Sequence, residues 1–175
     1  MHVSLTAKLG LVGLAAQASA HGLVQTPATR QPGSATEAAC GRTMVQFYTA
    51  DGTSYPEALL RANPQGLADG FDAEKCNLWL CKGYQFDDNT ANVQSYKPGD
   101  VVDMEVYIRI PHRGHANTKF SITMPELEGK CTEPGACVIQ WYWLGQGQTY
   151  ESCIDFTVPA ATEAPARRMR GRSRV

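Results

Sequence analysis

The chain has 175 residues, 43% of them hydrophobic and 19% charged, which is enough for one folded domain with a hydrophobic core. Between residues 21 and 158, ten basic and sixteen acidic side chains give a net charge of −6. An acidic domain does not attract nucleic acid or an anionic membrane surface, so we expect neither as a partner. No stretch after residue 20 is long and apolar enough to span a bilayer.

Residues 1–20 have the pattern of a secretory signal peptide. A short, weakly basic start precedes the apolar run 9–16, and Ala18-x-Ala20 supplies the small-residue cleavage pattern. Cleavage after Ala20 predicts a secreted, extracellular protein that begins at His21. We expect residues 21–158 to form its single domain and the Pro-, Ala- and Arg-rich residues 159–175 to be a disordered tail.

An N-terminal histidine is chemically special. It carries a free amine and an imidazole that can close a six-membered chelate on one metal, whereas the backbone nitrogen of an internal histidine is an amide. The unperturbed pKa of the amine, about 7.7 to 8.0, also lets a metal displace its proton near neutral pH. His21 is therefore a candidate metal ligand.

Six cysteines lie after the signal, and an even number in a secreted chain favours three disulfides over thiolate metal sites. Six cysteines allow 15 connectivities, so the sequence leaves the pairing open. Sequence proximity favours Cys76–Cys81 and Cys131–Cys137, which leaves Cys40–Cys153.

Apolar and polar residues alternate in several segments, and this pattern predicts that β-strands are the main secondary structure. The clearest strand covers residues 101–110, after the turn signal Lys97-Pro98-Gly99-Asp100. Helix signal is scarce, and Ser54 and Glu57 resemble a capping box at the start of one short helix. We therefore predict an all-β fold, an antiparallel immunoglobulin/fibronectin-like β-sandwich with long loops, one short helix and stabilising disulfides. In chain order, the expected elements are a strand at 22–26, a surface loop at 30–41, a helix at 57–62, a loop at 69–77, and strands at 101–110, 120–124, 137–144 and 152–158.

The strand at 101–110 leads into a loop that contains His112 and His115. A rigid strand end is a good place from which to hold a ligand. The amine and imidazole of His21 and one loop imidazole would place three nitrogens around one metal, and all-nitrogen tetragonal coordination suits Cu(II) best.

These residues resemble the lytic polysaccharide monooxygenases, and most closely the auxiliary-activity family 16, which is fungal and cellulose-active. The shared features are a signal followed by His-Gly, a later His-x-Gly loop, and a Gln-x-Tyr-x-x-Cys segment near the end. The resemblance runs from residue 21 to 158, through Ala39-Cys40-Gly41, Cys76-Asn77-Leu78-Trp79-Leu80-Cys81, Pro111-His112-Arg113-Gly114, Gln140-Trp141-Tyr142-Trp143 and Gln148-Thr149-Tyr150-Glu151-Ser152-Cys153-Ile154-Asp155-Phe156.

The resemblance implies a copper site with one copper ion. His21 and His112 match the two ligands of the family's histidine brace, with His112 preferred over His115, and Tyr150 matches the axial residue. Gln148, two residues earlier on the same strand face, would hydrogen-bond the oxygen species that reacts at the metal. We expect Trp141 and Trp143 to be core residues and not a platform for sugars.

The implied activity is oxidative cleavage of β-1,4-glycosidic bonds in a crystalline polysaccharide, with cellulose first. The implied enzyme is a monomer that uses hydrogen peroxide or dioxygen and an external electron donor such as ascorbate or a secreted reductase. The alternatives are a non-catalytic secreted copper-binding protein that keeps the brace, and a carbohydrate-binding module whose histidines are incidental. The chain departs from the family after Asn117, where a strand and a surface loop are missing, so we expect incomplete strand pairing beside His112.

Overall fold

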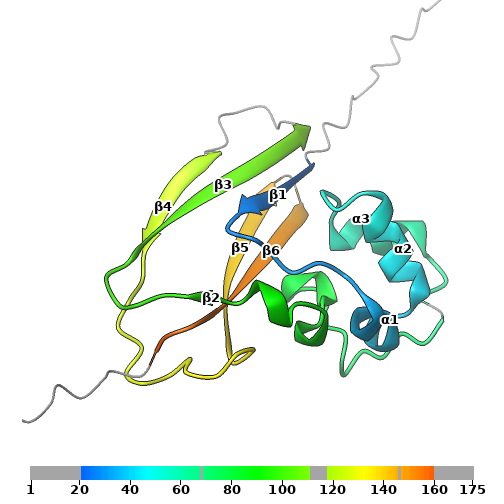
Figure 1. Ribbon diagram of the computed structural model, residues 1–175. Helices are drawn as coiled ribbons and strands as arrows, with labels where there is room; N and C mark the ends of the chain where they lie inside the picture. Colours follow the sequence, from blue (N-terminus) through cyan, green and yellow to red (C-terminus); the bar gives the residue numbers. More distant parts are fainter. Residues whose placement is uncertain (1–20, 68, 111–117, 146, 160–175) are drawn as a thin grey trace, which may run out of the picture.

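Two three-stranded β-sheets form most of the protein in the computed structural model, which describes residues 21–67, 69–110, 118–145 and 147–159 (Figure 1). One sheet has the order β1-β3-β4 and is antiparallel. In the other, of order β2-β6-β5, the β5–β6 pair is antiparallel and β2 runs parallel to β6. The strands are β1 (His21–Thr26), β2 (Gln94–Ser95), β3 (Val101–Ile110), β4 (Lys119–Thr123), β5 (Cys137–Gly145) and β6 (Gln148–Thr157).

The predicted alternation along β3 is confirmed over most of the strand. Val102, Met104 and Val106 are buried and pack with Ile154 and Phe156 of β6, so the inner faces of the two sheets share one core. Toward its end β3 leaves the core, and Ile110 is 37% exposed. Burial of one face every second residue holds a strand in register, since a slip of one residue would expose all of these side chains.

Strand β3 is paired along only part of each edge. Strand β1 pairs with residues 105–110 along one edge, and strand β4 pairs with residues 101–105 along the other, with Val101 opposite Thr123 and Glu105 opposite Lys119. On the β4 side, residues 107–110 of β3 pair with no strand of the described chain. Within the described residues, the expected incomplete strand pairing next to the loop is therefore observed on this edge.

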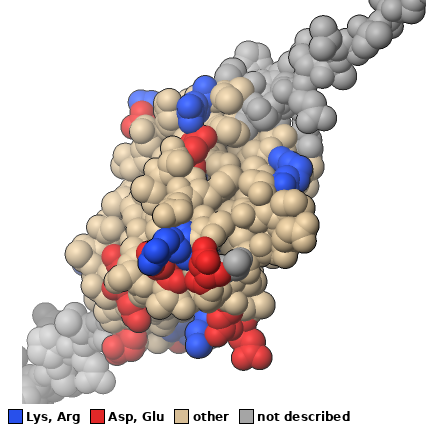
Figure 2. Space-filling view, turned by 90° about the vertical axis from the view of Figure 1, so that its right-hand side faces the viewer, with Lys and Arg blue, Asp and Glu red and all other residues tan. Residues whose placement is uncertain are grey.

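The expectation of one short helix is wrong. The described residues include three α-helices, which lie together beside the sheets (Figure 1). The helical side faces the viewer in Figure 2, where acidic side chains gather along the lower part of the surface, in keeping with the net negative charge of residues 21–158. The helices are α1 (Ser34–Cys40), α2 (Arg42–Ala50) and α3 (Pro56–Ala62), with the short 3-10 turns η1 (Cys81–Gly83), η2 (Phe86–Asp88) and η3 (Thr90–Asn92).

The expectation of a surface loop at 30–41 is wrong, because helix α1 forms most of this range. Its first backbone N–H groups have no partner within the helix, and the Asp88 carboxylate accepts them from a distant part of the chain. The N–H groups of Gly33, Ala35 and Thr36 donate to Asp88 over 2.9, 2.9 and 2.8 Å, and the Thr36 hydroxyl donates over 2.7 Å. A cap that comes from more than fifty residues away leaves no local sequence signal.

Helix α3 matches the helix expected at 57–62 but not its capping box. It begins with Pro56 at its first turn, and no side chain caps it. Glu57 turns instead to β6, where its carboxylate accepts hydrogen bonds from the Thr149 N–H over 3.1 Å and from the Thr149 hydroxyl over 2.8 Å.

The outer face of β6 anchors the helices and the long connecting segments. Every second residue of the strand makes one attachment, and both faces of the strand are therefore buried. Beside the contact of Glu57 with Thr149, the backbone N–H of Lys82 donates to Glu151, Cys81 is bonded to Cys153, and Arg30 forms a two-pronged ion pair with Asp155 over 2.6 and 2.7 Å.

All six cysteines lie within the described residues and form three disulfides. Cys131–Cys137 is confirmed, whereas the expected pairs Cys40–Cys153 and Cys76–Cys81 are wrong. Cys40 bonds to Cys76 and Cys81 to Cys153, because α1 packs on the segment before residue 76 and η1 lies on β6. Three disulfides are consistent with an extracellular protein. Across residues 21–67, 69–110, 118–145 and 147–159, the structure has no helix with the length and apolar character to cross a bilayer.

Candidate metal centre

His21 lies where β3 ends. As the first residue of β1 it is paired with Ile110, the last residue of β3. The next residue, Gly22, is closely packed, since a Cβ there would lie 2.9 Å from Ile108 and 3.6 Å from the Trp143 ring. The close pairing holds the start of the mature chain against the sheet.

The two loop histidines, His112 and His115, lie outside the described residues. Consecutive Cα atoms are 3.8 Å apart, so the Cα of residue 112 can be no more than about 7.6 Å from that of Ile110. Because His21 is paired with Ile110, connectivity alone limits the distance between His21 and residue 112.

The His21 imidazole has an unusual environment. Its Nδ1 is buried without a hydrogen-bond partner in the described residues, although it lies 3.2 Å from Oδ2 of Asp51. The ring also meets the Tyr55 ring edge-on, with centroids 5.8 Å apart. Nδ1 is the imidazole atom that, with the amine, would close a six-membered chelate, so an unpartnered Nδ1 fits a metal ligand.

Asp51 is a residue of this site that the sequence analysis missed. Its Oδ1 accepts hydrogen bonds from the backbone N–H and the hydroxyl of Thr53, over 3.0 and 2.5 Å, and its Oδ2 lies 2.8 Å from Arg109. Burial raises its pKa, but the hydrogen bonds of Thr53 and the charges of Arg109 and His21 outweigh this, so the pKa lies below its ordinary value. A single aspartate after a helix carries no pattern that could have revealed it.

Gln148 and Tyr150 lie on the same side of β6, as the period of a strand predicts. The Tyr150 hydroxyl donates to Oε1 of Gln148 over 2.5 Å, and Tyr150 is fully buried. Burial and the charges of Tyr55 and Glu57 raise the pKa of Tyr150 well above its ordinary value, so its hydroxyl stays protonated.

Aromatic rings connect His21 with Tyr150. The Tyr55 ring contacts both, with its centroid 5.1 Å from that of Tyr150, and its hydroxyl accepts a hydrogen bond from Arg61 over 2.5 Å. Trp143 lies 5.1 Å from Tyr150 on the other side. Trp141 and Trp143 are partly buried against these residues, and Trp141 also packs on the main core, in agreement with the expected packing role.

The described residues thus bring His21, Asp51, Tyr55 and Tyr150 to one end of the sheets. They contain no group of three or more His, Cys, Asp or Glu side chains placed to hold a metal ion. Of the predicted nitrogen donors, only those of His21 belong to this part of the chain.

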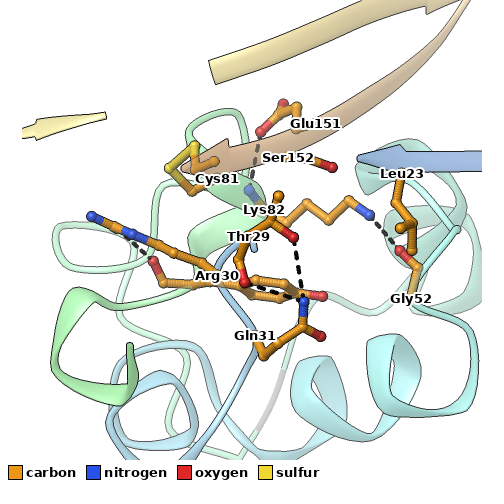
Figure 3. A pocket seen from close by; sticks show the side chains of 11 residues that line it. Leu23, Thr29, Arg30, Gln31, Gly52, Cys81, Lys82, Glu151 and Ser152 are labelled. Atoms are coloured by element: carbon orange, nitrogen blue, oxygen red, sulfur yellow. Dashed lines mark hydrogen bonds between the residues drawn. A yellow bond between two sulfur atoms is a disulfide. The ribbon is translucent and has the colours of Figure 1, made fainter. Parts of the chain in front are cut away.

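A second buried polar group lies on the outer face of β6. Lys82 and Glu151 line a small pocket of about 20 Å³ between β6, η1 and the chain after α2 (Figure 3). The Lys82 ammonium donates to the Gly52 carbonyl over 2.7 Å, and Oε2 of Glu151 accepts the Lys82 backbone N–H over 3.0 Å. Burial lowers the pKa of Lys82 to about 8 and raises that of Glu151 to about 7.

We expect Glu151→Gln to change how stability depends on pH. The folded pKa of Glu151, about 7, lies above its unfolded value of about 4.5, so between these values the unfolded chain releases a proton that the folded protein keeps, and the wild type is destabilised as the pH rises. The variant has no carboxyl at this position. Its free energy of unfolding, relative to that of the wild type, should therefore rise by about 1–3 kcal/mol between pH 4.5 and 7 in urea titrations.

Glu74→Gln is the matched control, because Glu74 is exposed. The difference in free energy of unfolding between Glu74→Gln and the wild type should stay nearly constant with pH. A Glu151→Gln difference that is equally flat would mean that the carboxyl has the same pKa in the folded protein as in the unfolded chain.

Known proteins provide no close match: no model of a protein family matches the chain, and no curated protein is significantly similar to it in sequence.

Proposed function

We propose that the chain is a secreted copper-dependent lytic polysaccharide monooxygenase that cleaves β-1,4-glycosidic bonds of crystalline polysaccharide, with cellulose as the first substrate. The observation that carries the proposal is the buried Nδ1 of His21, which has no hydrogen-bond partner in the described residues and belongs to the first residue after the expected cleavage site. In the same proposal, the two packed sheets are an immunoglobulin-like sandwich that carries the site at one end.

The residues divide the work of the proposed site. His21 would hold the copper ion through its amine and Nδ1, and His112 would add the second imidazole. Bound copper supplies one-electron redox chemistry that activates hydrogen peroxide or dioxygen for attack on a carbon of the glycosidic link. Tyr150 would lie beside the copper ion with a protonated hydroxyl, and its hydrogen bond to Oε1 would leave the Gln148 Nε2 group to donate toward the oxidant.

A non-catalytic copper-binding protein is the second candidate. It is favoured by the Asp51 carboxylate, because a negative charge beside the metal position stabilises Cu(II) over Cu(I). A carbohydrate-binding module with incidental histidines would have no reason to leave the His21 Nδ1 buried without a hydrogen-bond partner in the described residues.

Product analysis distinguishes these proposals. The mature protein loaded with copper should release oxidised oligosaccharides from cellulose when ascorbate is supplied, as detected by mass spectrometry. Tight copper binding without oxidised products would favour the non-catalytic protein, and no copper binding would leave the carbohydrate-binding module.

In the same assay, Gln148→Ala should release oxidised sugars about 10- to 100-fold more slowly, with copper affinity nearly intact. The amide is proposed to act on the oxidant and not on the resting metal. Gln94→Ala serves as a control, since in the described residues the Gln94 side chain, on β2, bonds only to the nearby Asn92 carbonyl. An unchanged rate in Gln148→Ala would mean that Gln148 is an ordinary strand residue.

A further inference from the structure

We propose that Asp51 is an additional ligand of the metal, so that the site holds a carboxylate oxygen besides the nitrogens of His21. The inference rests on the proposed copper site and extends its ligand set. It follows from the position of the Asp51 carboxylate relative to Nδ1 of His21, the side-chain atom that would bind the metal.

The distance between the two donor atoms agrees with shared coordination. Nitrogen and oxygen ligands that lie about 2.0 to 2.2 Å from one metal, at angles between 90° and 109°, are separated by about 2.8 to 3.5 Å. Nδ1 of His21 and Oδ2 of Asp51 are 3.2 Å apart.

A role as hydrogen-bond acceptor for the metal ligand does not explain this contact. Such outer partners bind the ring nitrogen that is not coordinated, where a proton remains. Asp51 lies instead beside Nδ1, which carries no proton once the chelate with the amine has formed. In the metal-free protein the contact is an ion pair when the imidazole is protonated, and it lacks the geometry of a hydrogen bond.

The carboxylate is held in place for this role. Thr53 donates twice to Oδ1, and Arg109 reaches Oδ2 over 2.8 Å from β3. Each carboxylate oxygen accepts in two directions, so Oδ2 keeps one for a metal after its contact with Arg109. The pairing of β1 with β3 brings His21 and Arg109 together, and the segment after α2 adds Asp51.

Asp51→Asn tests the inference in the mature protein, with His21 as its first residue. The asparagine Oδ1 can still accept from Thr53, but the anionic donor is lost. Titration with Cu(II) against a competing chelator should show at least a 10-fold loss of affinity. The electron paramagnetic resonance spectrum should change from that of a mixed nitrogen–oxygen site, and the reduction potential of the bound copper should rise.

The matched control is Asp103→Asn, on the same strand as Arg109, whose carboxylate bonds only to Ser121 over 2.6 Å in the described residues. It should leave affinity, spectrum and potential unchanged. Should Asp51→Asn fail to fold, the wild type still provides a test, because added Zn(II) should shift the carboxyl ¹³C resonance of Asp51 in nuclear magnetic resonance spectra.

The outcomes separate this inference from the proposed function. A wild type that binds copper tightly, together with an Asp51→Asn variant of equal affinity and identical spectrum, would overturn the role of Asp51 alone. A wild type that does not bind copper tightly would overturn both. An unshifted Asp51 carboxyl resonance in the Zn(II)-loaded wild type would also count against coordination by Asp51.

Discussion

Mature protein that retains a single extra residue before His21 should lose tight Cu(II) binding. The extra residue turns the amine of His21 into an amide, which is a poor donor, and the six-membered chelate with Nδ1 can no longer form. We expect the affinity to fall by more than the roughly 10- to 100-fold that the loss of an outer-shell partner costs. Isothermal titration of the two forms measures the difference.

An extra residue at the other end of the chain is the control, because the described chain ends at residue 159, far along the sequence from β1. That form should bind copper as the mature protein does. Equal affinity in all three forms would mean that the amine is not a ligand and that the brace is wrong.

His112→Ala should remove one nitrogen ligand of the bound copper, whereas His115→Ala should affect only its surroundings. The reason is connectivity, since residue 112 is two residues from Ile110, and Ile110 is paired with His21. The affinity for Cu(II) should fall by more than 10-fold in the first variant and by less than about threefold in the second. Electron paramagnetic resonance of the two variants counts the nitrogens.

The two variants are controls for each other, because both replace a histidine of the same segment with alanine. A nitrogen lost from the spectrum of His115→Ala and kept in that of His112→Ala would reverse the assignment of the ligand. If neither variant loses a nitrogen ligand from its spectrum, the loop does not belong to the copper site.

The site was predictable only in the parts that depend on neighbours in sequence. The shared face of Gln148 and Tyr150 follows from the period of a strand, whereas the place of His21 at the start of the mature chain stays a prediction from the cleavage pattern. Asp51 and Tyr55 were not predictable, because they reach His21 from the segment between α2 and α3, 30 or more residues along the chain. Their side chains become neighbours of His21 only once β1 has paired with β3.

The sequence by itself determined the approximate positions of five of the six described strands, but not β2 or the start of β6 at Gln148. The alternation over residues 101–110 and the turn before it are local patterns, and burial of one face every second residue is enough to specify them. Tertiary structure decided helices α1 and α2 and the disulfides Cys40–Cys76 and Cys81–Cys153, whereas helix α3 and Cys131–Cys137 were predicted from the sequence. Helix α1 depends on the Asp88 carboxylate from a distant turn, and Cys81 meets Cys153 because η1 packs on β6. These features depend on contacts between segments that are far apart in the sequence, and the local spacing of residues does not indicate such contacts.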